Sequence, residues 1–509
     1  MFTRTGRIAT GAALLALAVS ACSAGSSTSP GAGGGTTGSS GSGGSVTIGL
    51  VAEPASLDFT KTDGAAIPQA LLTNVYETLV KQDQDGKIVP SLATSWKVSD
   101  DKKTYTFDLT PNAKFSNGDP FTADDAVFSI NRVKTDWTIS LKAAMNVVAE
   151  AKAVTPNQLQ VTLSTPSNDW LFRMTTRIGA MMDPKGVDAL ATKPVGTGPY
   201  VFDAWNRGDS ITLKANPSYW SQQPAYSTVV LKYFKDATAL NNALLTGTIN
   251  VIGTVQAPET LKQFEGNSKY QVIEGTTNGE VVLSFNNAKA PLTNVKLRQA
   301  IRTAIDHKAL METCWAGKGT LIGSMVPPTD PWYEDRTGDF PYSQDKAKQL
   351  LAESGTATPA LRLRVPNLPY AVACGQVVKS QLEQVGITVN LDQLEFPAAW
   401  LQTVFKDHDY DMSIVAHVEP RDLPAVFGNP QYYTQYNNPQ LQADIKAADA
   451  GTTDEQVTSM KKAAQELSQD AAADFLFLLP NLIVADQGIK GLPKNAITES
   501  FDLSALSKG

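Results

Sequence analysis

Histidine is the side chain that most often builds metal and acid–base sites, and this sequence has three: His307, His408 and His417. They lie far apart in the chain. None forms the His-x-x-x-His spacing that places two imidazoles on one helix face. A histidine-built zinc site is therefore not expected. The sequence predicts neither a bound metal ion nor a cofactor.

A nucleophilic serine with a nearby lysine occurs at two places, Ser343–Lys346 and Ser459–Lys462. Neither Ser-Asp-Asn nor Lys-Thr-Gly accompanies them, and both pairs fall on the polar faces of predicted helices. There is also no Gly-x-Ser-x-Gly elbow. We therefore predict that the protein is not an enzyme. A secreted hydrolase is the alternative from another class, because glycosidases carry no motif that residue spacing reveals.

Cys22 closes the run Val19-Ser20-Ala21-Cys22, which resembles a bacterial lipobox, where the cysteine is lipidated and becomes the first mature residue. Residues 1–21 read as a lipoprotein signal peptide with two arginines and a short apolar run. That run is too short to span a bilayer, which takes about 20 apolar residues. We expect a lipid-anchored protein on the extracytoplasmic face of the cell membrane. An ordinary cleaved signal with a chance cysteine is the alternative.

Residues 22–44 continue from this cysteine as a Gly- and Ser-rich stretch that cannot bury enough apolar surface to fold. As a flexible coil it reaches roughly 25 Å. The rest of the chain is long enough for two to four domains at about 100–200 residues each. The formal net charge of -7 argues against a nucleic-acid partner.

Two cysteines remain in the folded part, Cys314 and Cys374. In an exported protein such a pair favours a disulfide over two buried free thiols. Period-two and helical patterns predict a mixture of strands and helices, typical of α/β or α+β lobes. Strands are predicted over residues 45–50, 104–109, 158–163, 210–214, 228–234, 281–286, 361–365, 387–391 and 475–479. Helices are predicted over residues 69–79, 237–245, 294–305, 343–354, 371–385, 440–448 and 455–470. We also expect a hairpin turn over residues 83–86 and a helix capped by Thr122.

One block of motifs is specific enough to indicate a family. It resembles the signature of the family 5 solute-binding proteins of ABC importers, which include dipeptide, oligopeptide and nickel receptors. Further segments agree in order along nearly the whole folded part. The matching stretches are residues 95–100, 104–107, 114–129, 196–200, 216–220, 295–301, 304–306, 346–351 and 385–387, in which Trp96, Phe107, Phe115 and Phe121 are expected to pack in the core.

The resemblance implies an α/β, two-lobed fold like that of periplasmic binding proteins (class II, cluster C type), with an extra subdomain. Two crossing strands join the lobes, which close on the ligand by a hinge. Carried over, lobe I comprises residues 45–75, 195–275 and 480–509, the extra subdomain residues 76–194, and lobe II residues 276–479.

The resemblance also points to a loop of lobe II. Peptide receptors of the family carry Gly-Asp…Asp-Pro there, and the aspartate pairs with the ammonium group of the peptide. This chain departs from that pattern, with His417, Glu419, Arg421 and Asp422 in the loop. Glu419 or Asp422 can replace the aspartate. Arg421 either neutralises one of them or forms a bidentate pair with a ligand carboxylate.

Four more residues are candidates for the ligand pocket: Glu53, Trp400, Tyr432 and Tyr433. Core packing is the alternative for the aromatic three. The resemblance implies a monomeric extracytoplasmic receptor that captures short peptides and delivers them to the permease of an ABC transporter. A receptor for oligosaccharides, metal chelates or another small solute, and a signalling receptor without import, remain open.

Overall fold

The computed structural model describes residues 43–357 and 359–509. The predicted signal peptide, Cys22 and all but the last two residues of the predicted linker lie outside this part. No helix within it combines the length and the apolar character that crossing a membrane requires.

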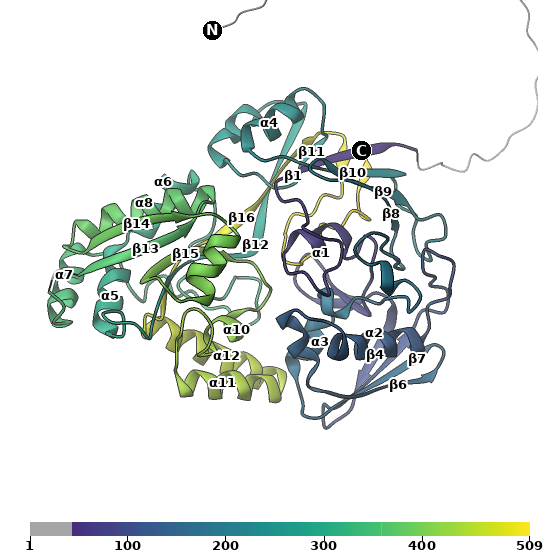
Figure 1. Ribbon diagram of the computed structural model, residues 1–509, viewed down its shortest axis with the longest axis horizontal. Helices are drawn as coiled ribbons and strands as arrows, with labels where there is room; N and C mark the ends of the chain where they lie inside the picture. Colours follow the sequence, from purple (N-terminus) through teal and green to yellow (C-terminus); the bar gives the residue numbers. More distant parts are fainter. Residues whose placement is uncertain (1–42, 358) are drawn as a thin grey trace, which may run out of the picture. The chain divides into compact units, whose positions relative to one another are not determined.

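One ten-stranded sheet runs through the folded part (Figure 1). Two long antiparallel strands at its middle, β12 and β16, pair with each other along most of their length. At one end β12 pairs with β15, and at the other β16 pairs with β11. The strand order is β14 (Thr388–Leu394), β13 (Ala360–Pro366), β15 (Met412–His417), β12 (Tyr270–Phe285), β16 (Ala473–Asp486), β11 (Val251–Ile252), β1 (Ser45–Leu50), β10 (Thr228–Tyr233), β9 (Ser210–Ala215) and β8 (Tyr200–Asn206).

The two long strands divide this sheet into two lobes. We call the part with β1 and β8–β11 lobe I; it also holds α1 (Ala66–Leu71) and α4 (Ala237–Leu245). The part with β13–β15 is lobe II. Helices cover its sheet and bury its core: α5 (Val295–Ala304), α6 (His307–Trp315), α7 (Gln344–Glu353), α8 (Pro369–Glu383), α11 (Pro439–Ala450) and α12 (Thr453–Gln469). The predicted chain boundaries of the lobes stay a prediction.

A smaller four-stranded sheet forms what we call the subdomain, with the order β4 (Ala93–Val98), β5 (Thr104–Leu109), β7 (Gln158–Leu163) and β6 (Val148–Thr155). Its helices are α2 (Ala123–Thr135) and α3 (Asn168–Arg173). Thr122 is the N-cap of α2, as predicted, and it forms a capping box with Asp125. Of the motif aromatics, Phe107, Phe115 and Phe121 are buried, which confirms their predicted core role, and Trp96 is half-buried against the same core.

Local signals predicted most elements well. The strands at Ser45–Leu50, Thr104–Leu109 and Gln158–Leu163 and the helix at Ala237–Leu245 have the predicted bounds. The predicted turn over 83–86 joins β2 (Val80–Gln82) and β3 (Ile88–Pro90) in a hairpin. The strands predicted over 281–286 and 475–479 are only parts of β12 and β16.

The predicted helix over residues 69–79 is wrong. Helix α1 ends at Leu71, because Leu72 is extended and Thr73 has a positive φ of 61°. Tertiary contacts hold this break. The side-chain amide of Asn74 donates to the Phe501 carbonyl at 2.8 Å, and Thr73 hydrogen-bonds Ser500. The apolar residues that are spaced as in a helix instead lie in a buried, irregular segment after α1.

Helices α6 and α8 are joined by a disulfide between Cys314 and Cys374, whose Cα atoms lie 4.9 Å apart. Both cysteines are buried in the lobe II core. The bond therefore ties two helices that cover one face of the sheet.

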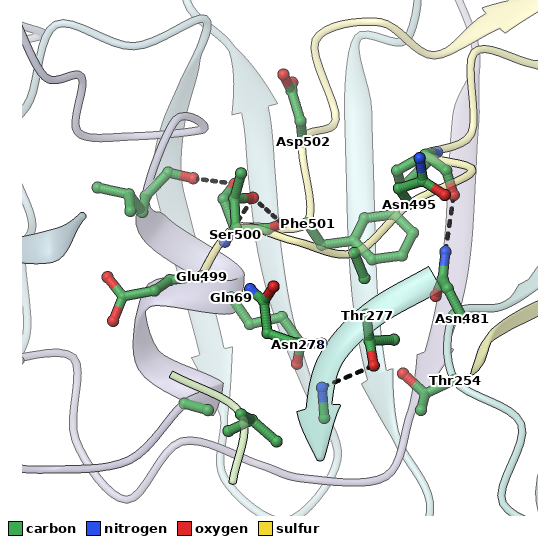
Figure 2. Close-up of a pocket in the computed structure, with 18 of the residues that line it drawn as sticks. Gln69, Thr254, Thr277, Asn278, Asn481, Asn495, Glu499, Ser500, Phe501 and Asp502 are labelled. Atoms are coloured by element: carbon green, nitrogen blue, oxygen red, sulfur yellow. Dashed lines mark hydrogen bonds between the residues drawn. The ribbon is translucent and has the colours of Figure 1, made fainter. Parts of the chain in front are cut away.

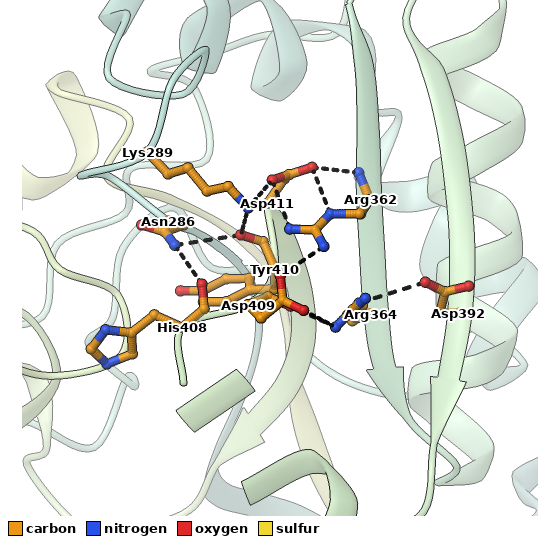
Figure 3. Close-up of polar contacts among 9 residues, drawn as sticks. All are labelled: Asn286, Lys289, Arg362, Arg364, Asp392, His408, Asp409, Tyr410 and Asp411. Carbon is orange, nitrogen blue, oxygen red and sulfur yellow. Dashed lines mark hydrogen bonds and ion pairs between the residues drawn. The ribbon is translucent and has the colours of Figure 1, made fainter. Parts of the chain in front are cut away.

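A chain of alternating charges fixes the start of β15, the strand that leads to the predicted ligand loop (Figure 3). Asp409 accepts from Arg362 at 2.7 Å and from Arg364 at 2.8 Å. Asp411 pairs with Lys289 at 3.0 Å and accepts the backbone N–H of Arg362 at 2.8 Å. Arg362 and Arg364 belong to β13, so these ion pairs tie β13 to the segment that leads into β15.

Candidate ligand-binding site

A cavity of about 360 Å³ lies where lobe I, the two long strands and lobe II meet (Figure 2). Lobe I contributes Gln69 and the C-terminal segment around Glu499. The long strands contribute Asn278 and Asn481, and lobe II contributes the loop at Val418 and Glu419. The volume is that of an ordinary small-molecule site.

The polar lining combines amide, hydroxyl and charged side chains. Asn278 and Asn481 donate their amide hydrogens to carbonyls of the C-terminal segment, at 2.8–2.9 Å. Within the described chain their side-chain oxygens have no donor, and the Gln69 side chain has no partner. The lining therefore offers amide groups for hydrogen bonds to a ligand. The amide residues are Gln69, Gln82, Gln84, Asn278, Asn481 and Asn495.

Arg177 links two parts of the chain at the edge of this cavity. Its guanidinium is almost fully buried and pairs with Glu499, whose second oxygen accepts the Arg177 backbone N–H at 2.6 Å. The same guanidinium nitrogen, Nη2, lies 3.2 Å from Glu419 of lobe II. One cation of the subdomain thus faces two carboxylates.

Glu419 keeps 41% of its side chain exposed. Partial burial and the neighbouring carboxylate of Glu499 raise the pKa of Glu419 to about 7, against the opposing effect of Arg177. Arg173 also lowers this pKa, and Lys81 and Asp502 line the same cavity, so the site carries further charges of both signs. The exposed part of the Glu419 carboxylate can pair with a cation of a ligand.

Asp422 and Glu280 lie deeper, and both are buried with one carboxylate oxygen that has no partner in the described chain. Burial and the charge of Glu419 raise the pKa of Asp422, and burial and Asp422 raise the pKa of Glu280. Neither residue lines the cavity. Of the two predicted carboxylates of the loop, Glu419 is the one that does.

His417 belongs to a buried chain of polar groups beneath the loop. Its Nε2 lies 2.9 Å from the Tyr433 hydroxyl, which lies 2.7 Å from the hydroxyl of Ser284. Its Nδ1 is 3.8 Å from Asp422. Burial lowers the pKa of His417 to about 4, so the ring is neutral at pH 7. These hydrogen-bonded side chains therefore support the loop from the protein interior.

Arg421 packs between aromatic rings and does not line the main cavity. Its guanidinium carbon lies 3.8 Å from the Phe172 ring centroid and 4.9 Å from that of Trp332. Its Nε is 3.8 Å from Asp330. These contacts join lobe II to the subdomain, because Phe172 belongs to α3.

The predicted aromatic candidates form a cluster of their own. The rings of Trp400 and Tyr433 are 5.7 Å apart, and those of Tyr432 and Tyr433 are 5.2 Å apart. Trp400 and Tyr433 are buried, and none of the three lines the cavity. Glu53 also lies away from the cavity lining and accepts from Trp205 and from the N–H of Gly208, both at 2.8 Å.

Comparison with known proteins identifies the family. Residues 87–439 match the family described as bacterial extracellular solute-binding proteins, family 5 (middle region). The chain belongs to this family. Its fold and the position of its cavity between two lobes agree with that assignment.

Relatives of this solute-binding protein bind diverse ligands. It is 30% identical over 353 residues to heme-binding protein A of Haemophilus influenzae, a match that covers 62% of this chain and 64% of that protein. It is 28% identical to the nickel-binding periplasmic protein of Escherichia coli, covering 62% and 65%. These matches span a little under two thirds of each relative. A match of 26% to the probable D,D-dipeptide-binding periplasmic protein of Escherichia coli covers 91% of this chain and 94% of that protein.

Solved structures share the fold. The Helicobacter pylori periplasmic binding protein DppA, in complex with the peptide STSA, has a TM-score of 0.82 at 21% identity, covering 92% of this chain and 98% of that one. The oligopeptide-binding protein AppA of Bacillus subtilis, with a nonapeptide, has a TM-score of 0.79 at 21% identity, covering 92% and 99%. Family membership therefore establishes the fold and the solute-binding class and leaves the ligand open.

Several lining residues of this family 5 protein were not among the predicted ones, above all Arg177, Asn278 and Glu499. Arg177 and Glu499 lie 322 positions apart, and no local pattern connects them. The sequence carries a partial signal for Glu499. The segment after β16 has too many polar residues to form a buried core strand. Within the described chain, no cluster of three or more metal-capable side chains occurs.

Proposed function

We propose that this protein captures short peptides in the cavity between its lobes. The carrying observation is the pair of carboxylates at the cavity edge. Glu419 and Glu499 pair with the same Arg177 guanidinium, and the Glu419 side chain is 41% exposed. The N-terminal ammonium of a peptide would pair with the exposed part of the Glu419 carboxylate. A hydrogen bond to a charged group of this kind is worth about 1.5–3 kcal/mol.

The lining supports a peptide over the alternative ligands. Side-chain oxygens of Asn278 and Asn481 can accept peptide N–H groups. Phe501 is the aromatic ring among the described lining residues, and it is buried, so a platform for stacking a sugar ring is not apparent. No histidine appears among those residues to hold a metal chelate.

We further propose that the receptor works as a monomer at the outer face of the membrane. Lipids on Cys22 would hold it there, and it would hand its cargo to the permease of an ABC transporter. The sequence around Cys22 and the membership in a family of extracellular solute-binding proteins support this location. Stable anchoring needs more than one acyl chain.

Equilibrium dialysis against a pool of tripeptides and the same pool acetylated at the N-terminus tests the peptide proposal. We expect free-amine peptides to be retained, with about tenfold or more weaker retention of the acetylated ones, because acetylation removes the positive charge. Retention of neither pool, or equal retention of both, would overturn the proposal.

A further inference from the structure

A second contact between lobe II and the subdomain lies away from the ligand cavity. Helix α11 of lobe II ends beside the start of α3 (Figure 1). We call this contact the latch. It consists of Lys102, Ser167, Asn168 and Asp169 of the subdomain and Ala448, Asp449 and Gly451 of lobe II. None of these residues lines the cavity.

Asp449 is the central acceptor of the latch. One of its carboxylate oxygens accepts from the Ser167 hydroxyl at 2.8 Å and from the backbone N–H of Asp169 at 2.9 Å. Ser167 also caps α3 by accepting from the N–H of Trp170 at 3.2 Å. The carboxylate of Asp449 therefore meets two donors that are held at the start of α3.

Backbone carbonyls at the end of α11 complete the latch. Asn168 donates its amide hydrogens to Ala448 at 2.9 Å and to Gly451 at 2.8 Å, and the Lys102 ammonium donates to Gly451 at 2.8 Å. The last carbonyls of a helix have no partner within the helix. The subdomain thus supplies the partners that the C-terminal end of α11 lacks.

These bonds depend on how the lobes are placed. The chain passes into lobe II through β12 and out through β16, so lobe II can rotate about these strands. Rotation that opens the cavity would pull α11 away from α3 and break the latch. The hydrogen bonds of the latch therefore favour the closed arrangement, although the latch residues do not contact the ligand.

We propose that Asp449 sets ligand affinity by stabilising the closed arrangement through the latch. The inference rests on the proposed capture of a ligand by closing lobes. A residue that acts only on the equilibrium between open and closed forms changes the affinity for every ligand by the same factor. Loss of both hydrogen bonds to this side chain should weaken binding about tenfold.

Electron–electron distance measurements on the ligand-free protein test the latch without any ligand. Spin labels go on Val154→Cys of the subdomain and Tyr342→Cys of lobe II, both exposed, in the full chain with Cys22→Ala. We expect Asp449→Ala to shift the distance distribution toward longer, open values. Asp449→Asn keeps an acceptor oxygen and should retain the original distribution. Asp444→Ala, on the same helix outside the latch, is the matched control.

Binding of trialanine provides the second readout. Asp449→Ala should bind it about tenfold more weakly than the original chain, and Asp449→Asn and Asp444→Ala should bind it almost equally well. If neither the original chain nor any variant binds trialanine, the result counts against the proposed capture of peptides. The distance measurements alone then test the latch. An unchanged distance distribution in Asp449→Ala would overturn the latch, whatever the binding result.

Discussion

Two properties of Glu419 matter for function. It pairs across the lobes with Arg177, and it faces the cavity with a pKa of about 7. Glu499 satisfies the same guanidinium from the other side. The proposed peptide ammonium would therefore complete a four-charge arrangement.

Replacing Glu419 with alanine should weaken peptide binding about tenfold or more, which corresponds to roughly 1.4 kcal/mol. The substitution removes the carboxylate while leaving Glu499 to balance Arg177. Calorimetric titration with a retained tripeptide gives the affinity. Glu312→Ala, an exposed change on lobe II, should leave it unaltered. Equal affinities for both variants would remove Glu419 from the site.

Peptide affinity should rise as the pH increases from about 6 to about 7.5. Glu419 has a raised pKa of about 7, so the carboxyl group is largely protonated below that pH and a ligand ammonium favours the ionised form. Above about pH 8 the α-amino group of the peptide itself loses its proton, which limits the gain. The rise should vanish in Glu419→Gln. A pH profile that is the same in that variant would contradict the assignment.

Among the helices and strands, N-caps and alternating strands could be predicted from the sequence. Helix ends that depend on tertiary contacts could not. Thr122, Asn294 and Ser343 were legible as helix starts because each N-cap bond is local. The end of α1 was not, because Phe501 and Ser500 determine it from the far end of the chain. The candidate site follows the same rule. Glu419 was predicted because it lies in the loop that corresponds to the family's ligand loop, whereas Arg177 lies 242 residues from it and is brought to it only by folding.

The disulfide between α6 and α8 should stabilise lobe II. Cys314 and Cys374 are 60 residues apart, and a bond closing a loop of that length typically contributes about 2–4 kcal/mol, chiefly by restricting the unfolded chain. Replacing both cysteines with serine should lower the free energy of unfolding by that amount in urea titrations. Reduction of the original protein should give a similar loss. Identical unfolding curves with and without the bond would show that it does not stabilise the lobe.

At the scale of the whole molecule, a tethered receptor needs its anchor for location and not for binding. Cys22→Ala should move the protein from the membrane fraction to the soluble exported fraction, because the acyl chains would be missing. Ligand affinity should stay the same, since the described residues that line the cavity begin at Val51 and Cys22 is not among them. Fractionation with immunoblotting measures the first result. A variant that remains in the membrane fraction would contradict the lipid anchor.

The central claim is that the cavity selects short peptides, and native mass spectrometry of one competition mixture tests it most directly. The protein is incubated with equal concentrations of di- to pentapeptides, maltotriose and a nickel–histidine chelate, then desalted and measured. We expect a one-to-one adduct with peptide mass, and much less of it in Glu419→Ala. Adducts of the saccharide or of the chelate alone would contradict the account.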